Sequence, residues 1–349
     1  MIWNDFRVPT VDIGPYVADV PDAAACAGVA AQLDRACQEV GFVQIVGHGI
    51  PERTIDDLAA ALDAFFALPL ETKKGYRRGP AENRGYAPPK SESLSMSLGV
   101  PSASTMNDFY EAITVGTEAS AFPGLDLPET SYARNTWPEA VPSFRPAVEE
   151  YFLRAQGLSR VLVRAFADAL GLPPGYFDGL VDHSIEVLKM NNYALPESEI
   201  RVVDELTGMG AHTDFGIVTV LWADQVPGLQ VLGADSRWHD VQPCDGALLI
   251  NLGDAMARWT NGRWRSTIHR VDPPIVGGRI QRRRSAAFFF DGNHDAVIET
   301  LSGCLADGES GYPPITIAEN IASKLAGMKS GVAPVGLREA ERVLAADTH

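Results

Sequence analysis

In the first half of the chain, apolar residues recur among polar ones with the periodicity of amphipathic helices. Residues 22–39 carry this pattern and stop before Gly41, which suits a helix C-terminus. The apolar run 42–46 (FVQIV) then predicts a short strand. Residues 51–69 predict a second helix because proline stands at the start and again at the end. Residues 142–172 predict a long third helix that braces a sheet.

The second half of the chain is β-rich. From about Ser184, short apolar runs are separated by Gly, Pro and Asp turns, which predict an antiparallel barrel or sandwich. The segment IAENIASKLAG near residue 317 predicts a closing helix. Because no internal repeat or low-complexity linker is visible, we expect one β core (176–325), a helical N-terminal region with short strands packed on it (1–175), and a C-terminal segment (326–349).

Residues 86–106 are rich in Ser, Pro and Gly and lack a clear period. The segment is longer than a routine connection between two elements. Two interpretations fit this composition: a mobile loop near a functional site, or an ordinary surface excursion.

Charge and composition narrow the functional classes. The formal net charge of −16 at pH 7 would repel a phosphate backbone, so we expect a small-molecule substrate and no nucleic-acid partner. No apolar run is long enough to cross a membrane, and residues 1–12 lack the basic region and apolar core of a signal peptide, which favours a cytoplasmic protein without a membrane partner. The four cysteines lack metal-ligand spacing, so reduced thiols are expected. The sequence carries no signal of oligomeric state.

Candidate metal ligands stand out in the β-rich half. His212 and Asp214 lie two positions apart, so both side chains would point inward from one strand, where His269 completes a three-ligand face. Of the seven histidines, only His212 has an acid two residues on. Two imidazoles and one carboxylate leave half an octahedron open, which is typical of non-haem Fe(II) sites that bind a co-substrate and O2.

Several motifs around these residues occur in the order of a known family. The chain resembles the isopenicillin N synthase-like family of Fe(II)- and 2-oxoglutarate-dependent dioxygenases, roughly from residue 7 to residue 325. This resemblance implies a mainly β fold with flanking helices around a double-stranded β-helix, the jelly-roll or cupin-like core. It also implies a cytoplasmic oxidoreductase that uses Fe(II), 2-oxoglutarate and O2. The motifs are VPTVDIG, GFVQIVGHGI, GAHTDFGIVTVL, PGLQVL, NLGDAMARWTNGRWRSTIHRV and RRSAAFFF.

The resemblance also assigns the co-substrate contacts. Arg283 and Ser285 match the Arg-x-Ser pair that holds the far carboxylate of 2-oxoglutarate, a group for which guanidinium offers a two-pronged fit. Asn191 and Tyr193 match the strand that approaches the same co-substrate. Arg283 lies further from His269 than is usual in the family, which predicts a longer hairpin turn between them.

Residues on the substrate side are less sharply defined by the pattern. Lys189 shares the strand face of Asn191 and could meet the substrate, or be an exposed strand lysine. Phe289 shares the face of Arg283 and is expected to wall the pocket, whereas Phe288 and Phe290 would pack outward under helices. By resemblance, Asp108 belongs to a stretch that lines the substrate side.

Three rival arginines flank Arg283. Arg282 and Arg284 have the wrong strand parity relative to Ser285, and Arg279 lies in a glycine-rich turn. We expect all three to be solvated charges.

The function implied by the resemblance is oxidation of a small molecule by hydroxylation, desaturation or ring formation, with release of succinate and CO2. An alternative is an oxidase of the same fold that uses no 2-oxoglutarate, in which the Arg-x-Ser pair contacts another carboxylate or bicarbonate. A second alternative is a non-catalytic ligand-binding relative. That alternative is disfavoured because such a protein would be expected to lose metal ligands.

Overall fold

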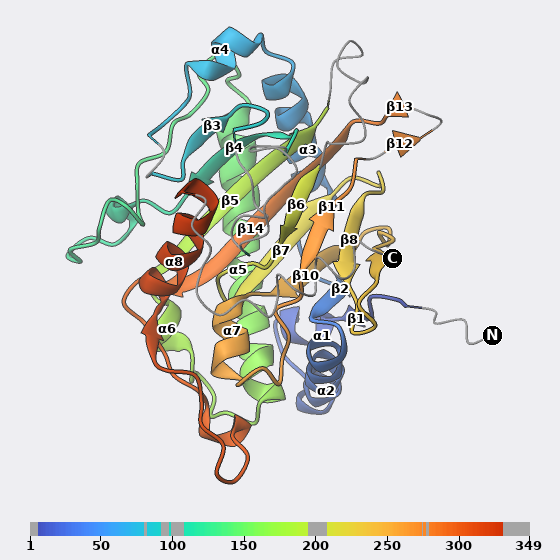
Figure 1. Cartoon of the computed structure of the whole chain (residues 1–349), viewed down its shortest axis with the longest axis vertical. Helices are drawn as coiled ribbons and strands as arrows, with labels where there is room; N and C mark the ends of the chain where they lie inside the picture. Colours follow the sequence, from blue (N-terminus) through green and yellow to red (C-terminus); the bar gives the residue numbers. More distant parts are fainter. Residues whose placement is uncertain are drawn as a thin grey trace.

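Strands from both halves of the chain meet in one large sheet (Figure 1). The computed structural model describes residues 6–79, 82–91, 98, 108–194, 208–273, 275–276 and 279–330. The order across the large sheet is β1 (Thr10–Asp12), β2 (Phe42–Val46), β10 (Leu248–Leu252), β7 (Val218–Ala223), β14 (Arg283–Asn293), β5 (Ser184–Tyr193), β4 (Glu111–Gly116) and β3 (Gly85–Ala87). Only β1 and β2 run parallel among the pairings of this sheet.

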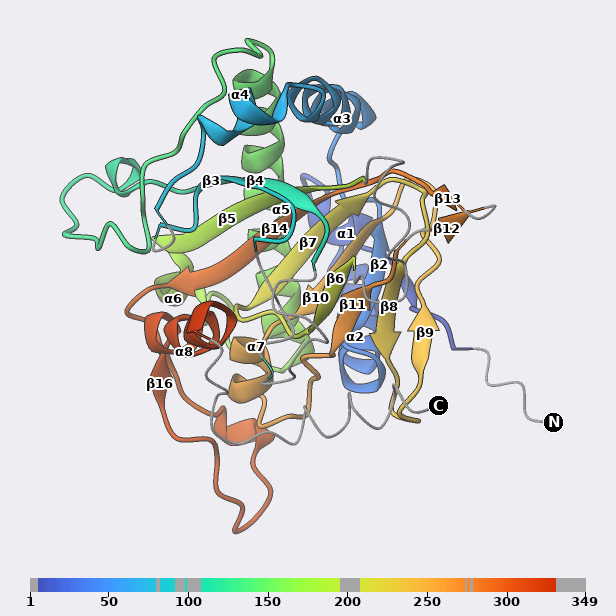
Figure 2. The same cartoon turned by 45° about the horizontal axis from the view of Figure 1, so that its top comes forward.

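A smaller sheet of four strands lies over the large one. Its order is β6 (Met209–His212), β11 (His269–Val271), β8 (Leu229–Leu232) and β9 (Trp238–Asp240). Residues of both sheets line a single pocket, so the two sheets face each other across it (Figure 2). The hairpin of β12 (Ile275–Val276) and β13 (Arg279–Ile280) separates β11 from β14, and another two-stranded sheet joins β15 (Val297–Ile298) to β16 (Ile315–Thr316). The expected longer turn before Arg283 is therefore confirmed.

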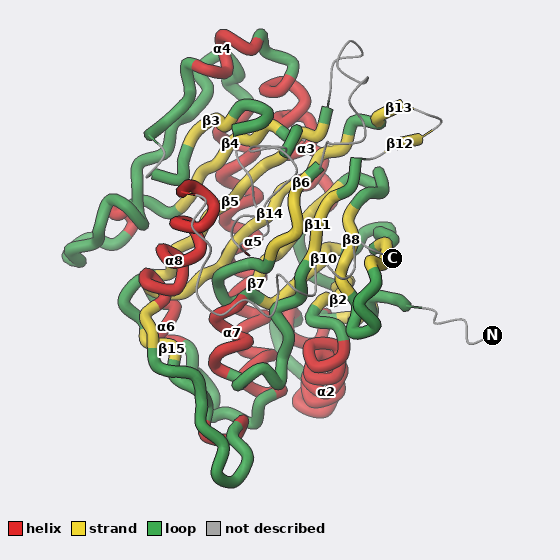
Figure 3. The backbone as a smooth tube through the Cα atoms, viewed as in Figure 1, coloured by secondary structure: helices red, strands yellow, loops and turns green. Residues whose placement is uncertain are grey.

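Helices cover the outer face and the ends of the large sheet (Figure 3). The longest, α5 (Phe144–Ala169), packs against α2, α3, β7 and β14. The expectation of a long bracing helix is confirmed, and Gly157 does not interrupt it. The helices are α1 (Gly14–Val17), α2 (Ala23–Glu39), α3 (Glu52–Phe66), α4 (Leu70–Lys74), α5, α6 (Asp178–Val181), α7 (Asp254–Trp259) and α8 (Ile317–Ser330), with short 3₁₀ turns at Ala119–Ala121 and Ser302–Cys304.

The ends of α2 follow from the local sequence. The Asp22 carboxylate accepts a hydrogen bond from the backbone N–H of Ala24, so it caps the first turn. At the other end the N–H of Gly41 donates to the carbonyl of Ala36. Gly41 has a φ of +75°, in the left-handed region that side chains disfavour, so glycine ends this helix at low cost.

Alternation along β14 separates the core from the pocket. Ala286, Phe288 and Phe290 are fully buried in the main apolar cluster, and the Phe288 ring meets Phe152 of α5 edge-to-face at 5.0 Å. Phe289 instead lines the pocket between the sheets. Both expectations for these phenylalanines are confirmed, because successive strand residues point to opposite faces.

A buried ion pair ties α4 to the large sheet. Lys73 Nζ lies 2.7 Å from Glu111 Oε2 on β4 and also donates to the Phe66 carbonyl. The Glu111 carboxylate further accepts hydrogen bonds from Tyr86 and Asn192. The carboxylate therefore has three donors in a site nearly closed to solvent.

Replacing Lys73 with methionine should lower the free energy of unfolding by about 1.5 to 3 kcal/mol, the range for a lost hydrogen bond to a charged group. The loss stays moderate because Tyr86 and Asn192 still bind the Glu111 carboxylate. Urea denaturation measures the change. The double variant Lys73→Met/Glu111→Gln should recover part of it, and a double variant less stable than the single one contradicts this account.

Two earlier expectations fall largely on residues outside the described part. Of the segment 86–106, the structure describes residues 86–91 and Leu98, and the C-terminal segment is described only to Ser330. The cysteines are Cys26, Cys37, Cys244 and Cys304, and all are free thiols, as expected. Within the described residues, none of the helices has both the length and the apolar character needed to cross a bilayer.

Candidate active site

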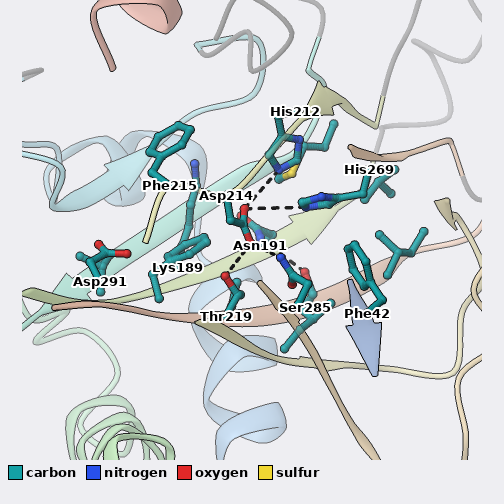
Figure 4. Close-up of a pocket in the computed structure, with 18 of the residues that line it drawn as sticks. Phe42, Lys189, Asn191, His212, Asp214, Phe215, Thr219, His269, Ser285 and Asp291 are labelled. Atoms are coloured by element: carbon teal, nitrogen blue, oxygen red, sulfur yellow. Dashed lines mark hydrogen bonds and ion pairs between the residues drawn. The ribbon is translucent and has the colours of Figure 1, made fainter. Parts of the chain in front are cut away.

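The pocket between the sheets brings together the three candidate metal ligands (Figure 4). His212 ends β6 and His269 begins β11, and the two residues pair directly across these strands. Oδ1 of Asp214 lies 3.8 Å from Nε2 of His212 and 3.8 Å from Nε2 of His269. The three ligand atoms thus converge on one point in a buried site, as a facial triad requires.

One detail of the expectation was wrong. Strand β6 ends at His212, so Asp214 does not extend from the same strand but lies in the loop that follows. Its position is fixed instead by its surroundings: the Asp214 carbonyl accepts a hydrogen bond from the backbone N–H of Asp254, which begins α7. The ligand atoms meet even though the strand is shorter than the pattern indicated.

Backbone carbonyls orient both imidazoles. Nδ1 of His212 lies 2.7 Å from the Gly210 carbonyl, and Nδ1 of His269 lies 3.1 Å from the Thr267 carbonyl. Because a carbonyl can only accept, Nδ1 carries the proton in each ring and the lone pair of Nε2 faces the metal position. Burial, with a further contribution from His269, lowers the pKa of His212 to about 3, so this ring is neutral and ready to bind a cation.

Two side chains of the large sheet hold the carboxylate ligand. Oδ2 of Asp214 accepts hydrogen bonds from the Thr219 hydroxyl at 2.5 Å and from Nδ2 of Asn251 at 2.7 Å. Burial raises the pKa of Asp214, but the two imidazoles and these donors outweigh it and lower the pKa overall. Oδ1 is thereby left facing the two imidazoles. The sequence analysis missed Thr219 and Asn251.

Replacing Thr219 with valine should weaken Fe(II) binding by about 10- to 100-fold, the usual effect of removing a residue that orients a metal ligand. Valine keeps the shape of the side chain but leaves Oδ2 of Asp214 with one donor fewer. Titration with Fe(II) under anaerobic conditions measures the affinity. Thr300→Val is the matched control, since the Thr300 hydroxyl bonds the Arg258 carbonyl outside the pocket; equal losses in both variants contradict the assignment.

A second group with metal-ligand chemistry lies on the surface. His183, His294 and Asp295 have ligand atoms close to one another. However, both ring nitrogens of His183 are already engaged, by Asp182 at 2.6 Å and by Asp295 at 3.0 Å. The buried triad is therefore the better metal centre.

A buried cation lies at one end of the pocket. Arg283 pairs across β14 and β5 with Tyr193, and its guanidinium carbon lies 5.2 Å from the centre of the Tyr193 ring. Arg283 is 3% exposed, yet Nε and Nη1 are buried without a hydrogen-bond partner in the described structure. Such orphaned donors are rare in folded proteins, and two of them on one guanidinium fit a carboxylate ligand.

The neighbours of Arg283 extend the same polar surface. Ser285 pairs with Asn191 across the two strands, and Nδ2 of Asn191 lies 3.4 Å from the Ser285 hydroxyl. Oδ1 of Asn191 is another buried atom without a partner in the described residues. Burial raises the pKa of Tyr193 to about 12, so its phenol stays protonated. The structure therefore brings together the four residues predicted for the co-substrate.

The rival arginines lie outside this surface. Arg282 binds Asp63 and Asn192, and Arg284 binds Asp63 and Asp224. Their strand parity is as expected. Arg282 also stays exposed, as expected, whereas Arg284 is partly buried, and both form ion pairs that tie the start of β14 to α3. The side chain of Arg279 lies outside the described part of the chain.

The residues predicted for the substrate side separate in space. Lys189 and Phe289 line the pocket, and the Lys189 ammonium lies 3.1 Å from the Tyr110 hydroxyl. Asp108 is buried, and its carboxylate accepts a hydrogen bond from the backbone N–H of Gly210, two residues before His212. Asp291 also lines the pocket and was missed, although it continues the odd-numbered face of β14 beyond Phe289.

Comparisons with known proteins agree with this geometry. Residues 8–140 match the family model described as non-haem dioxygenase in morphine synthesis N-terminal. Residues 186–292 match the family model of the 2OG-Fe(II) oxygenase superfamily. A 2-oxoglutarate-Fe(II) type oxidoreductase of Emericella nidulans, hxnY, is 36% identical over 90% of this chain and 88% of its own length. A homoarginine-6-hydroxylase of Arabidopsis thaliana is 33% identical over 86% of this chain and 90% of its own.

A solved structure shows the same fold. A full-length Neurospora crassa protein, crystallised in complex with alpha-KG and thymine, superposes with a TM-score of 0.79 at 26% identity, covering 93% of this chain and 98% of that one. The chain belongs to the isopenicillin N synthase-like family of Fe(II)- and 2-oxoglutarate-dependent dioxygenases. It is an oxidoreductase that uses Fe(II) and 2-oxoglutarate.

Proposed function

We propose that His212, Asp214 and His269 bind the Fe(II) and that the pocket oxidises a small organic molecule beside it. The observation that carries this proposal is the convergence of three buried ligand atoms next to a buried arginine with unpartnered donors. Bound Fe(II) with 2-oxoglutarate and O2 supplies the oxidising power to break a C–H bond, which side chains lack. The protein's own residues bind, orient and enclose the reactants.

Arg283 binds the far carboxylate of 2-oxoglutarate in this proposal. The orphaned Nε and Nη1 leave N–H donors of the guanidinium available to this carboxylate, and the Ser285 hydroxyl lies on the same strand face. Asn191 and Tyr193 add polar atoms from the paired strand β5. The guanidinium is already buried without the ligand. Binding therefore costs little additional side-chain entropy at Arg283.

Apolar side chains enclose the reacting centre. The rings of Phe42 and His269 form a T-shaped contact with 5.2 Å between the ring centres, and Phe215 and Phe289 line the pocket. These rings keep water from the metal position and leave a cavity of small-molecule size. Relatives named for homoarginine and validamycin A support a small polar substrate, oxidised by hydroxylation, desaturation or ring formation. Lys189 is the proposed substrate contact, with Asp108 supporting β6 behind the site.

For the fold, the two facing sheets support a double-stranded β-helix spanning residues 176–325, to which residues 1–175 add strands β1 to β4 of the large sheet and the helices that cover it. The net charge of −16 supports the absence of a nucleic-acid partner.

A direct test of this function requires no knowledge of the substrate. Purified protein supplied with Fe(II), 2-oxoglutarate and O2 should form succinate slowly even without substrate, and added candidate substrates should accelerate it. Succinate formation equal to that of a protein lacking the Asp214 carboxylate would refute the proposed function.

A further inference from the structure

Asp291 is the last residue of β14 whose side chain lines the pocket. Odd-numbered residues of this strand from Arg283 to Asp291 all line the pocket. Phe290 pairs with Glu186 and Gly292 pairs with Ile185, so Asp291 is the extra residue of a β-bulge. Bulges commonly re-aim a side chain next to a functional site, and this one places a carboxylate at the end of the pocket.

The Asp291 carboxylate is buried, and within the described residues it forms no hydrogen bond or ion pair. Gly216 leaves the space for it, because a side chain at position 216 would collide with Oδ1 of Asp291. A buried carboxylate without a partner costs stability, so this residue is not explained by support of the fold.

The charges around Asp291 make the site receptive to a cation. The charged groups that act on it most are the carboxylates of Asp214 and Glu186 and the guanidinium of Arg84. Glu186 is engaged by Thr117, Gln156 and Arg160. Burial, with contributions from Asp214 and Glu186, raises the pKa of Asp291 to about 7. A positively charged ligand group would relieve this unfavourable burial.

The two ends of the β14 face carry opposite charges. Arg283 and Asp291 are eight positions apart, which corresponds to roughly 26 Å along an extended strand. Ser285 and Phe42 lie on one side of the triad, whereas Asp291 and Phe215 lie on the other (Figure 4). The dianionic co-substrate and a cationic ligand would therefore bind on opposite sides of the metal position.

We propose that Asp291 binds an ammonium or guanidinium group of the organic substrate and so selects cationic small molecules. The assignment rests on the proposed function, which reserves the Arg283 end for 2-oxoglutarate. Phe215 and Phe289 line the same pocket and suit the apolar stem that carries such a cation. Lys189 lines the pocket as well, on the Asp291 side of the triad in Figure 4, where its ammonium lies 3.1 Å from the Tyr110 hydroxyl.

Matched ligand pairs test this proposal without knowledge of the natural substrate. The probes are butylguanidinium with its neutral isostere butylurea, and L-homoarginine with L-homocitrulline. Binding is measured by calorimetry and by ligand-observed NMR, using protein loaded with Fe(II) and 2-oxoglutarate under anaerobic conditions. We expect each cation to bind about 10- to 100-fold more tightly than its neutral partner. Equal binding within both pairs, including no binding, overturns the proposal.

The variant Asp291→Asn should abolish the preference for cations and leave the affinity for the neutral probes unchanged, while Asp291→Glu should retain part of the preference. Asp295→Asn is the control, because it removes an equal charge from an exposed carboxylate that contacts His183. A preference that persists in Asp291→Asn assigns the cation site elsewhere and overturns the proposal.

Two further measurements keep the outcomes separate. The affinity for 2-oxoglutarate should be the same in Asp291→Asn and in the wild type. If the wild type itself does not bind 2-oxoglutarate, that result counts against the proposed function instead. The melting temperature of Asp291→Asn should equal or exceed that of the wild type at pH 8, because the variant removes a buried charge. A marked decrease would assign Asp291 a structural role.

Discussion

Replacing Asp214 with alanine is expected to abolish oxidation and to weaken Fe(II) binding by more than about 100-fold, beyond the usual effect of losing a residue that only orients a ligand. The variant removes the anionic ligand that faces both imidazoles at 3.8 Å. It also leaves the Thr219 hydroxyl and the Asn251 amide without their acceptor. Metal content after dialysis and Fe(II) titration measure the first effect, and succinate formation measures the second.

The control for this prediction is Asp245→Ala. Asp245 is exposed in the turn before β10, so the variant has the same change of charge without touching the pocket. It should bind Fe(II) and form succinate like the wild type. Circular dichroism should show both variants folded. Full metal content together with normal turnover in Asp214→Ala would assign the metal to other residues.

Replacing Arg283 with leucine should weaken 2-oxoglutarate binding by about 30-fold to several thousand-fold, equivalent to roughly 2 to 5 kcal/mol. The change places an apolar side chain where two orphaned donors now face the pocket. Arg283→Lys should restore only part of the affinity, because an ammonium keeps the charge but loses the two-pronged geometry. Calorimetry with anaerobic Fe(II) protein gives the dissociation constants directly.

Arg282→Leu is the matched control, because Arg282 directly precedes β14 and pairs with Asp63 outside the pocket. Its 2-oxoglutarate affinity should be unchanged, although its stability should fall slightly. An unchanged affinity in Arg283→Leu would move the carboxylate site to another cation. Product formed by the wild type in the complete absence of 2-oxoglutarate would contradict the dependence on this co-substrate.

The strand faces could be predicted from the sequence because a two-residue period is a local property. Parity alone separated Arg283 and Ser285 from Arg282 and Arg284, and Phe289 from Phe288. The structure places these residues on opposite faces as expected. Helix α2 was also predictable, because its capping residues stand next to its apolar pattern.

Side-chain partners on other elements could not be predicted in this way. Nothing near Asp214 indicates that Thr219 and Asn251, on two different strands, bind its carboxylate. The ion pairs of Arg282 and Arg284 depend on Asp63, which lies in a helix far away in the sequence. The alternation of β14 could have placed Asp291 on the pocket face. However, a single acidic residue near a turn does not indicate a binding site until its burial and its lack of a partner in the described residues are known.

The ligands of the metal site differ in how easily mutation would damage them. The two histidines are oriented by carbonyls of Gly210 and Thr267, and a main-chain carbonyl survives almost any substitution. The carboxylate is held by the side chains of Thr219 and Asn251, each of which one nucleotide change could remove. Consider a random-mutagenesis library selected for loss of activity. Among residues that orient the metal ligands, inactivating substitutions should accumulate at the neighbours of Asp214 and be rare at the neighbours of the two histidines.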